Sequence, residues 1–154
     1  MNSLATPSPR RVVDLHSGFG ELADKLQPVL AVAFRLYVAR VFFTSGLIKL
    51  QNWDSTLALF ENEFHVPLLS PSIAALLGTG AEILLPVLLA LGIGTRFAAI
   101  ALFVFNIVAV ISYPDLSDAG LKDHILWGAL LLVTLVYGPG KIAVDHWLSR
   151  RTRR

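Results

Sequence analysis

Residues 28–50 read PVLAVAFRLYVARVFFTSGLIKL, an apolar run with Arg40 near its middle. About 20 consecutive apolar residues are enough for a helix to cross the hydrocarbon core of a bilayer, so this run predicts a transmembrane helix. A charge at the centre of a bilayer costs about 3 kcal/mol on insertion scales. We therefore expect Arg40 to be paired, hydrated or functional.

The rest of the chain has the same apolar character. Of its 154 residues, 55% are hydrophobic and 16% are charged, whereas soluble domains have roughly 25% charged residues. A soluble protein of this length could not bury so much apolar surface, so we expect an integral membrane protein with one domain. The chain has no cysteine, which excludes disulfides, thiolate-bound iron–sulfur clusters and CxxC redox chemistry. The formal net charge of +2 gives no reason to expect nucleic acid as a partner.

Three more apolar runs predict an all-α fold, a four-helix bundle within the membrane. Residues 92–96 (GIGTR) are expected to form a tight turn, and residues 138–140 (GPG) to end the last helix. Gly78 and Gly80 form a small-residue patch that would let another helix approach closely. The four predicted spans are about 28–50, 73–91, 97–113 and 122–137, within a membrane domain of residues 28–140.

The flanking segments are expected to lie outside the bilayer. Residues 1–27 contain an amphipathic helical pattern from Asp14 to Gln27, which would lie either on the membrane interface or against the end of the bundle. They lack the apolar core and cleavage pattern of a signal peptide, and Pro28 suits the first turn of a new helix. Residues 141–154 form a basic tail.

One connection between spans, residues 51–72, is long enough to hold structure of its own. Its apolar residues recur at helical spacing after Asp54, which is a plausible N-cap. We expect a short helix lying over one mouth of the bundle, with Trp53 as an anchor at the membrane interface.

Lysine and arginine are unevenly distributed around the predicted spans. The positive-inside rule then places both termini in the cytoplasm, as expected for a multi-pass protein of the bacterial inner (plasma) membrane. With that orientation the inner side has Arg10, Arg11, Lys25, Arg96, Lys141 and the four C-terminal arginines, and the outer side has Lys49 and Lys122.

A second intramembrane charge, Glu82, lies at nearly the same fractional depth in its span as Arg40. Arg40 shares a helix face with Tyr37 and Thr44, and this polar stripe is expected to point into the bundle because lipid disfavours it. Arg35, nearer the end of the same run, is expected to snorkel to the interface.

Two interpretations of Arg40 and Glu82 are open. In the first, they line a site for a polar head group, a quinone carbonyl or a proton, with Tyr37, Thr44 and Lys49 as further binding residues. In the second, they form a structural ion pair that fixes the register of two helices and binds no ligand.

A further group of polar residues maps to the outer mouth of the bundle. These residues would form either an entry site for a ligand or metal, or simply hydrated loops; their spacing matches no established metal motif. No histidine falls in the middle of a span, which disfavours haem, and no nucleotide-binding loop or hydrolase motif occurs. The group comprises Lys49, Glu61, Glu63, His65, Asp115, Asp123 and His124.

Several passages, taken in order, resemble the DoxX family of small membrane proteins over about residues 28–148. The resemblance implies a four-helix membrane bundle and a loose association with membrane redox complexes, since the family took its name from a subunit of a quinone-reducing oxidoreductase that acts on thiosulfate. Ala143 departs from the family pattern, where serine is common. The passages are RLYVARVFFTSGLIKL at 35–50, Trp53 with Val66-Pro67, GAE at 80–82, LGIGTRFAA at 91–99 and YGPGKIAVD at 137–145.

Two functions from different classes are compatible with these features. The first is a small non-catalytic subunit or anchor of a membrane redox complex, with a quinone as candidate cofactor and a redox protein as candidate partner. The second is a carrier or binding protein for a small lipophilic molecule or ion that uses Arg40 and Glu82. Neither makes the chain an enzyme on its own, and both allow a homo-oligomer.

Overall fold

The computed structural model describes residues 9–151, and these residues form helices without any strand. The predicted all-α class is therefore confirmed. The helices in chain order are α1 (Pro9–Gln51), α2 (Trp53–Asn62), α3 (Pro71–Leu91), α4 (Thr95–Ser112), α5 (Asp118–Tyr137) and α6 (Val144–Arg151).

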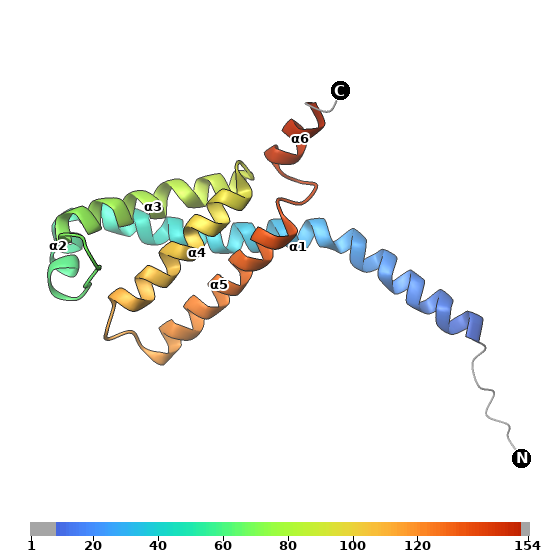
Figure 1. Ribbon diagram of the computed structural model, residues 1–154, viewed down its shortest axis with the longest axis horizontal. Helices are drawn as coiled ribbons and strands as arrows, with labels where there is room; N and C mark the ends of the chain where they lie inside the picture. The colour runs from blue at the N-terminus through green and yellow to red at the C-terminus, as the bar shows by residue number, and fades with distance from the viewer. Residues whose placement is uncertain (1–8, 152–154) are drawn as a thin grey trace, which may run out of the picture.

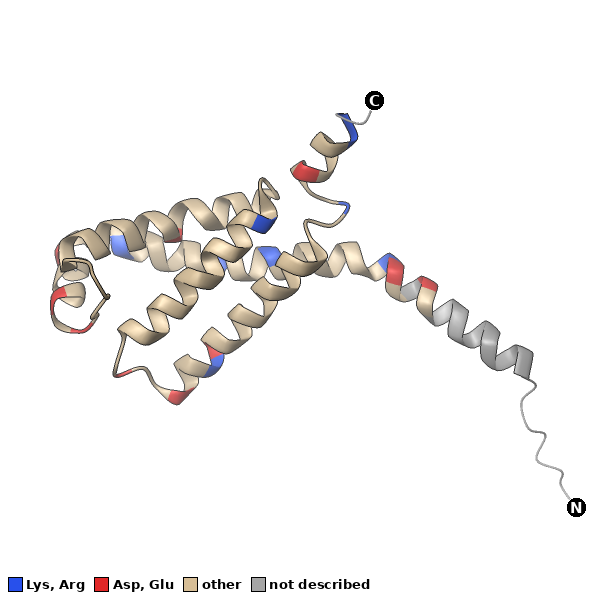
Figure 2. Ribbon diagram, in the orientation of Figure 1, with Lys and Arg blue, Asp and Glu red and all other residues tan. Residues whose placement is uncertain are grey.

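Four of these helices are long and apolar enough to cross a membrane: α1 from Ala23 onward, α3, α4 and α5. They pack as a bundle with α2 at one end and α6 at the other, and the N-terminal part of α1 projects from the α6 end (Figure 1). Charged residues gather toward these two ends and on the part of α1 just before it enters the bundle (Figure 2). The four-helix membrane bundle is confirmed, whereas the cytoplasmic position of its termini stays a prediction.

Helix α1 differs from its predicted form. It runs without interruption through Pro28 and extends well beyond the bundle (Figure 1). The expectation that Pro28 begins a new helix is therefore wrong, because a proline removes one backbone hydrogen bond without always ending the helix. The amphipathic pattern of residues 14–27 becomes part of α1, and its contact with the membrane interface stays a prediction.

The bundle core is built mainly from two helix pairs, α1 with α3 and α4 with α5. Val38, Phe42, Leu89, Leu102 and Leu131 are almost completely buried in it. Aromatic rings of three helices meet edge-to-face at its centre, where the ring of Phe42 lies 6.1 Å from Phe105 and 5.7 Å from Trp127. This packing fixes the rotation of α1.

Helix α1 packs closely against α3 at Gly46. A Cβ atom added to Gly46 would lie 2.9 Å from Glu82 Cβ and 2.9 Å from Ile83 Cδ1. The predicted small-residue patch on α3 has no such role, since a Cβ on Gly78 would touch only aromatic rings at 3.4 Å or more and one on Gly80 would meet nothing within 4 Å. Small residues let membrane helices pack closely, and here the residue is Gly46.

The Gly46→Ala variant is expected to be less stable than the parent by about 1–3 kcal/mol, because the added methyl group overpacks the α1–α3 contact. Gly80→Ala is the matched control and should be neutral or stabilising by up to about 1 kcal/mol, since alanine is the better helix former. Thermal unfolding in one detergent checks both. Equal stability of the two variants would contradict the close contact at Gly46.

At the α6 end, the segment after α5 is bound to the bundle by polar contacts. The Asp145 carboxylate accepts hydrogen bonds of 2.8 Å from Gly94 N, Thr95 N and Thr95 Oγ1, where α4 begins. Arg35 Nη2 donates to the carbonyl oxygen of Ile142 at 2.6 Å. Arg35 is only 2% exposed, so the prediction that it snorkels to the interface is wrong.

Asp145 should make the stability of the protein depend on pH. Partial burial raises the pKa of Asp145, but hydrogen bonds from Thr95 and Gly94 and the charge of Arg35 lower it by more, so the net shift is downward from 3.8. The ionised Asp145 carboxylate therefore stabilises the folded protein fully at pH values above 3.8. This contribution is lost as the pH falls through the lowered pKa of Asp145. Between about pH 7 and pH 2, the difference in melting temperature between the parent and Asp145→Asn should shrink toward zero. Asp24→Asn, on the projecting part of α1, is the control, and a difference that persists in acid would contradict this role.

Candidate binding cavity at the α2 end

A cavity of about 420 Å³ lies inside the bundle near α2, between α1, α3, α4 and α5. Most of its wall is apolar, with Val41, Leu77, Phe105 and Val108 among the lining residues. Polar side chains also reach it from every helix of the bundle. They are Ser45, Lys49, Glu82, Ser112, His124 and Trp127.

One wall of the cavity carries a buried ion pair between α1 and α3. Lys49 Nζ lies 2.7 Å from Glu82 Oε1 and 2.5 Å from Glu82 Oε2, and their side chains are 15% and 8% exposed. Ser45, one turn before Lys49, accepts from Nζ at 2.9 Å and donates to Glu82 Oε1 at 3.2 Å. All three donor positions of the ammonium group are thus occupied, which is what a charge out of contact with water requires.

A polar pair between α4 and α5 reaches the cavity through His124, which lines it, whereas Asn106 lies behind it. Asn106 Nδ2 donates to the carbonyl oxygen of His124 at 3.0 Å, and His124 Nδ1 lies 2.7 Å from Asn106 Oδ1. Since Oδ1 can only accept in this orientation, Nδ1 carries the proton and Nε2 of a neutral ring is left as an acceptor. The His124 ring also stands edge-on to Trp127, with centroids 4.8 Å apart.

Two polar atoms in the wall have no hydrogen-bond partner among the described residues. They are Trp127 Nε1 and Ser112 Oγ, and both are buried. A buried donor without a partner costs about 1–3 kcal/mol. Because both atoms expose almost no surface, a molecule in the cavity would recover that cost only if these side chains turn their polar atoms toward it.

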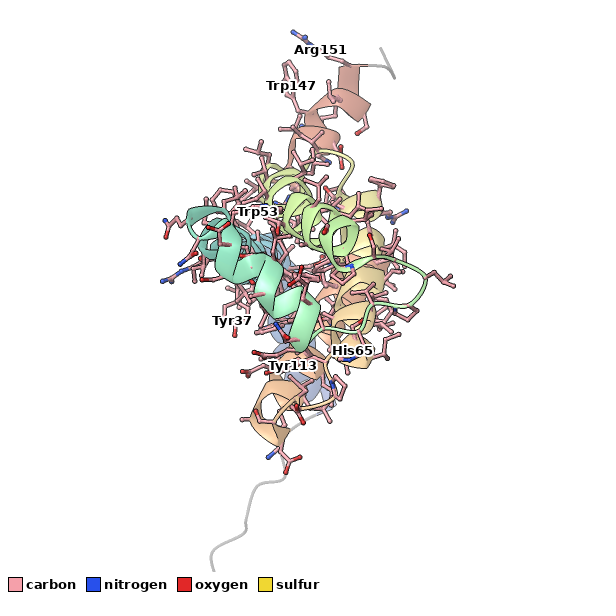
Figure 3. All side chains as sticks on the ribbon, turned by 90° about the vertical axis from the view of Figure 1, so that its left-hand side faces the viewer. Tyr37, Trp53, His65, Tyr113, Trp147 and Arg151 are labelled. Carbon is pink, nitrogen blue, oxygen red and sulfur yellow. The ribbon has the colours of Figure 1, made fainter. Side chains whose placement is uncertain are left out.

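The α2 end of the cavity is covered by α2 and the segment that follows it. Phe60 and Phe64 line the cavity and stack at 5.0 Å, and Phe64 stacks on Tyr113 at the same distance. His65 N donates to the carbonyl oxygen of Ser112 at 2.8 Å, which joins this cover to the end of α4. Figure 3 views the bundle from this side, with His65 and Tyr113 close together beside α2.

Tyr113 makes a second link to the cover. Its hydroxyl group donates to Glu63 Oε2 at 3.0 Å. The hydrogen bond to Glu63 raises the pKa of Tyr113, with a further contribution from the negative charge of that carboxylate. The cover is therefore held by polar and aromatic contacts with α4.

The predicted helix over the mouth of the bundle is present as α2, with one difference of detail. Its N-cap is Asn52, whose side chain accepts from Ser55 N at 3.3 Å, so the prediction of Asp54 is wrong. Trp53 packs against the cluster of Phe60, Ala74 and Ala75. A role for Trp53 as an interface anchor stays a prediction.

The structure does not bring Arg40 and Glu82 together. Glu82 pairs with Lys49, whereas Arg40 lies beside Val87 and Ala90, about one turn from the end of α3 at Leu91. The two charges are thus at different depths. The prediction that Arg40 and Glu82 lie at the same depth is wrong because the apolar run of α1 begins before α1 enters the bundle. Arg40 is in the middle of that run, but it is not in the middle of the bundle.

Of the other predicted site residues, one lines the cavity and the rest do not. Lys49 lines the cavity, but Tyr37, Arg40 and Thr44 are exposed on the outside of the bundle, so the expectation that this stripe points inward is wrong. The packing of Val38 and Phe42 in the core turns the stripe outward. A ligand-binding role for these residues stays a prediction.

Of the polar residues expected at the outer mouth, Lys49 and His124 reach the cavity, and Glu63 binds Tyr113 in its cover. Glu61 and His65 line a smaller hollow of about 290 Å³ under α2. No group of three or more potential metal ligands lies together in the described part of the chain.

The sequence analysis missed three polar residues that line the cavity: Ser45, Ser112 and Trp127. Ser45 could have been found from its spacing of four residues before Lys49, which places both on one helix face. Trp127 is of a residue type that also occurs at membrane interfaces, and a single serine at the end of a span gives no signal of its own. Only their burial beside the cavity distinguishes them.

Comparisons with known proteins find a family model and a relative that match most of the membrane domain. The family model described as DoxX matches residues 30–114. A protein of Haemophilus influenzae (strain ATCC 51907 / DSM 11121 / KW20 / Rd), described as uncharacterized, is 32% identical over 131 residues, which is 79% of this chain and 85% of that protein. No solved structure matches the chain significantly.

Proposed function

The chain belongs to the DoxX family, and we propose that it binds a small, largely apolar molecule in the cavity beneath α2. The observation that carries this proposal is the pair of unpartnered buried groups, Trp127 Nε1 and Ser112 Oγ, in the wall of a cavity of about 420 Å³. Pockets for small ligands are usually 300–1,000 Å³ in volume and mostly apolar, with a few placed polar groups.

The chemistry of the wall defines the class of ligand. The Trp127 indole only donates and the Ser112 hydroxyl can donate, so both fit carbonyl or ether oxygens of a bound molecule. Phe42 and Phe105 in the wall fit the faces of a flat ring. A quinone head group combines these features, and it is the candidate ligand predicted from the sequence. The Lys49–Glu82 pair then fixes α1 against α3 and keeps one side of the cavity polar.

This proposal corresponds to the second function considered from the sequence, with Lys49 in place of Arg40 as the partner of Glu82. The role of a redox-complex subunit stays a prediction, and a quinone bound in the cavity would be compatible with it. A redox-complex subunit requires a protein partner, whereas a binding protein does not. The binding role predicts that the purified chain takes up the ligand alone.

Tryptophan fluorescence can test the proposal directly. In the Trp53→Phe/Trp147→Phe variant, Trp127 is the one remaining tryptophan, and it lines the cavity. The purified variant in lipid nanodiscs is titrated with menadione, a naphthoquinone without a long tail. Quenching of Trp127 is expected to saturate, because the quinone fills one site next to the indole.

Substitutions on α4 provide the matched controls. Ala109→Phe, in the cavity wall, should abolish the saturable part of the quenching, whereas Val104→Phe, on the exposed face of α4, should leave it unchanged. Quenching that rises linearly with menadione and is equal in both variants would show partition into lipid only. That outcome would overturn the proposal for quinones.

A further inference from the structure

A second feature lies on the outside of the bundle, in the groove between α1 and α3 at the α6 end. The groove has a volume of about 310 Å³ and almost entirely apolar walls. Leu36, Ala39 and Phe43 line it from α1, and Pro86 and Ala90 line it from α3. Its position on the lipid-facing surface means that an acyl chain can enter it from the side.

Arg40 stands at this groove with its charge uncompensated. It is exposed and makes no hydrogen bond or ion pair with any residue that the structure describes. Since a charge within the hydrocarbon core is costly, the guanidinium group needs a partner outside this chain. The proteins and lipids around the bundle are the available sources of such a partner.

The direction of α1 brings that group toward the membrane edge. Arg40 lies beside Ala90, about one turn from the end of α3 at Leu91. Side chains of a helix tilt toward its N-terminus, and the N-terminal direction of α1 leads toward the α6 end (Figure 1). A long arginine side chain can therefore reach the lipid headgroups at that end.

A second polar side chain lies near Arg40 on α1. Tyr37, one turn closer to the membrane edge on the same face of α1, is 47% exposed. Figure 3 shows Tyr37 on the outside of the bundle. A guanidinium group at an apolar groove, with a phenol hydroxyl outside the groove lining but one turn away on α1, matches a phosphate with an acyl chain below it.

We propose that this groove is a binding site for one anionic phospholipid, with its phosphate at Arg40 and Tyr37 and an acyl chain between α1 and α3. Basic groups between membrane helices near the cytoplasmic surface are known to hold anionic lipid headgroups. A second copy of this chain is the weaker candidate, because a symmetric contact would bring two Arg40 side chains together. Neither residues 36–43 nor residues 86–90 contain a carboxylate that could pair with them.

Native mass spectrometry with added phosphatidylglycerol tests the site. The purified parent protein in detergent is expected to retain one phosphatidylglycerol molecule, and Arg40→Gln should weaken this binding about tenfold, as loss of a charged hydrogen bond does. Arg96→Gln is the matched control, because Arg96 lies at the same end of the bundle but away from the groove. It should retain the lipid as the parent does.

Ala90→Phe tests the groove without changing any charge. The larger side chain fills the space beside Arg40, so it should also displace the phospholipid. This variant tests the site even if Arg40→Gln does not fold. Equal loss of lipid in Arg40→Gln and Arg96→Gln would show general attraction by positive charge and overturn the site. Unchanged lipid binding in Arg40→Gln would overturn the site as well. So would the finding that a protein, and not a lipid, binds the parent but not Arg40→Gln.

Discussion

Replacing Lys49 with methionine, or Glu82 with methionine, is expected to destabilise the protein by about 3–5 kcal/mol, the cost of leaving one charge of a buried pair without its partner. The double variant Lys49→Met/Glu82→Met should recover most of that loss, because it removes both charges and keeps the volume of the side chains. Buried ion pairs often cost as much in desolvation as they gain in attraction. The pair therefore matters more for register than for net stability.

Chemical unfolding of the four proteins in one detergent gives the coupling energy as a double-mutant cycle. Lys122→Met removes an exposed lysine near the same end of the bundle and should have little effect. If the losses of the two single variants simply add in the double variant, Lys49 and Glu82 act independently. That result would remove the ion pair from the description of the cavity.

Gly92→Ala should be the most damaging change at the α6 end, with an expected loss of about 3 kcal/mol from left-handed strain and overpacking together. Gly92 has a φ of 72°, and a Cβ atom there would collide with Arg35 Nη1 and lie 2.6 Å from Ala143 Cβ. The substitution thus forces Arg35 or the 138–143 segment away from the bundle. The hydrogen bond from Arg35 to Ile142 would break as a result.

Gly94→Ala is the matched control for backbone strain alone. Gly94 has a φ of 55°, and a Cβ atom there would meet nothing within 4 Å, so this variant should lose only about 1 kcal/mol. Thermal unfolding measures both losses, and trypsin cleavage after Lys141 reports release of the segment before α6. Similar melting temperatures and similar cleavage in the two variants would contradict a tight contact at Gly92.

The amino-acid sequence by itself determined the class of the fold and its order of elements. The four apolar runs are each long enough to cross a bilayer, and glycine or proline residues separate the last three of them. In lipid every backbone polar group must be satisfied within the helix, so length and hydropathy are sufficient to identify such spans. The short helix over the bundle mouth could also be predicted, because its apolar spacing is helical.

Which charges meet was decided only by the tertiary structure. Arg40 and Lys49 lie on the same helix, and the sequence favoured Arg40 because it is nearer the middle of its apolar run. The contact depends on the rotation of α1, which the packing of Phe42 and Gly46 sets, and on how far α1 projects beyond the bundle. Neither quantity is encoded in the periodicity of one helix. The cavity likewise arises from gaps between five helices, so Ser112 and Trp127 acquire their role only in the assembled bundle.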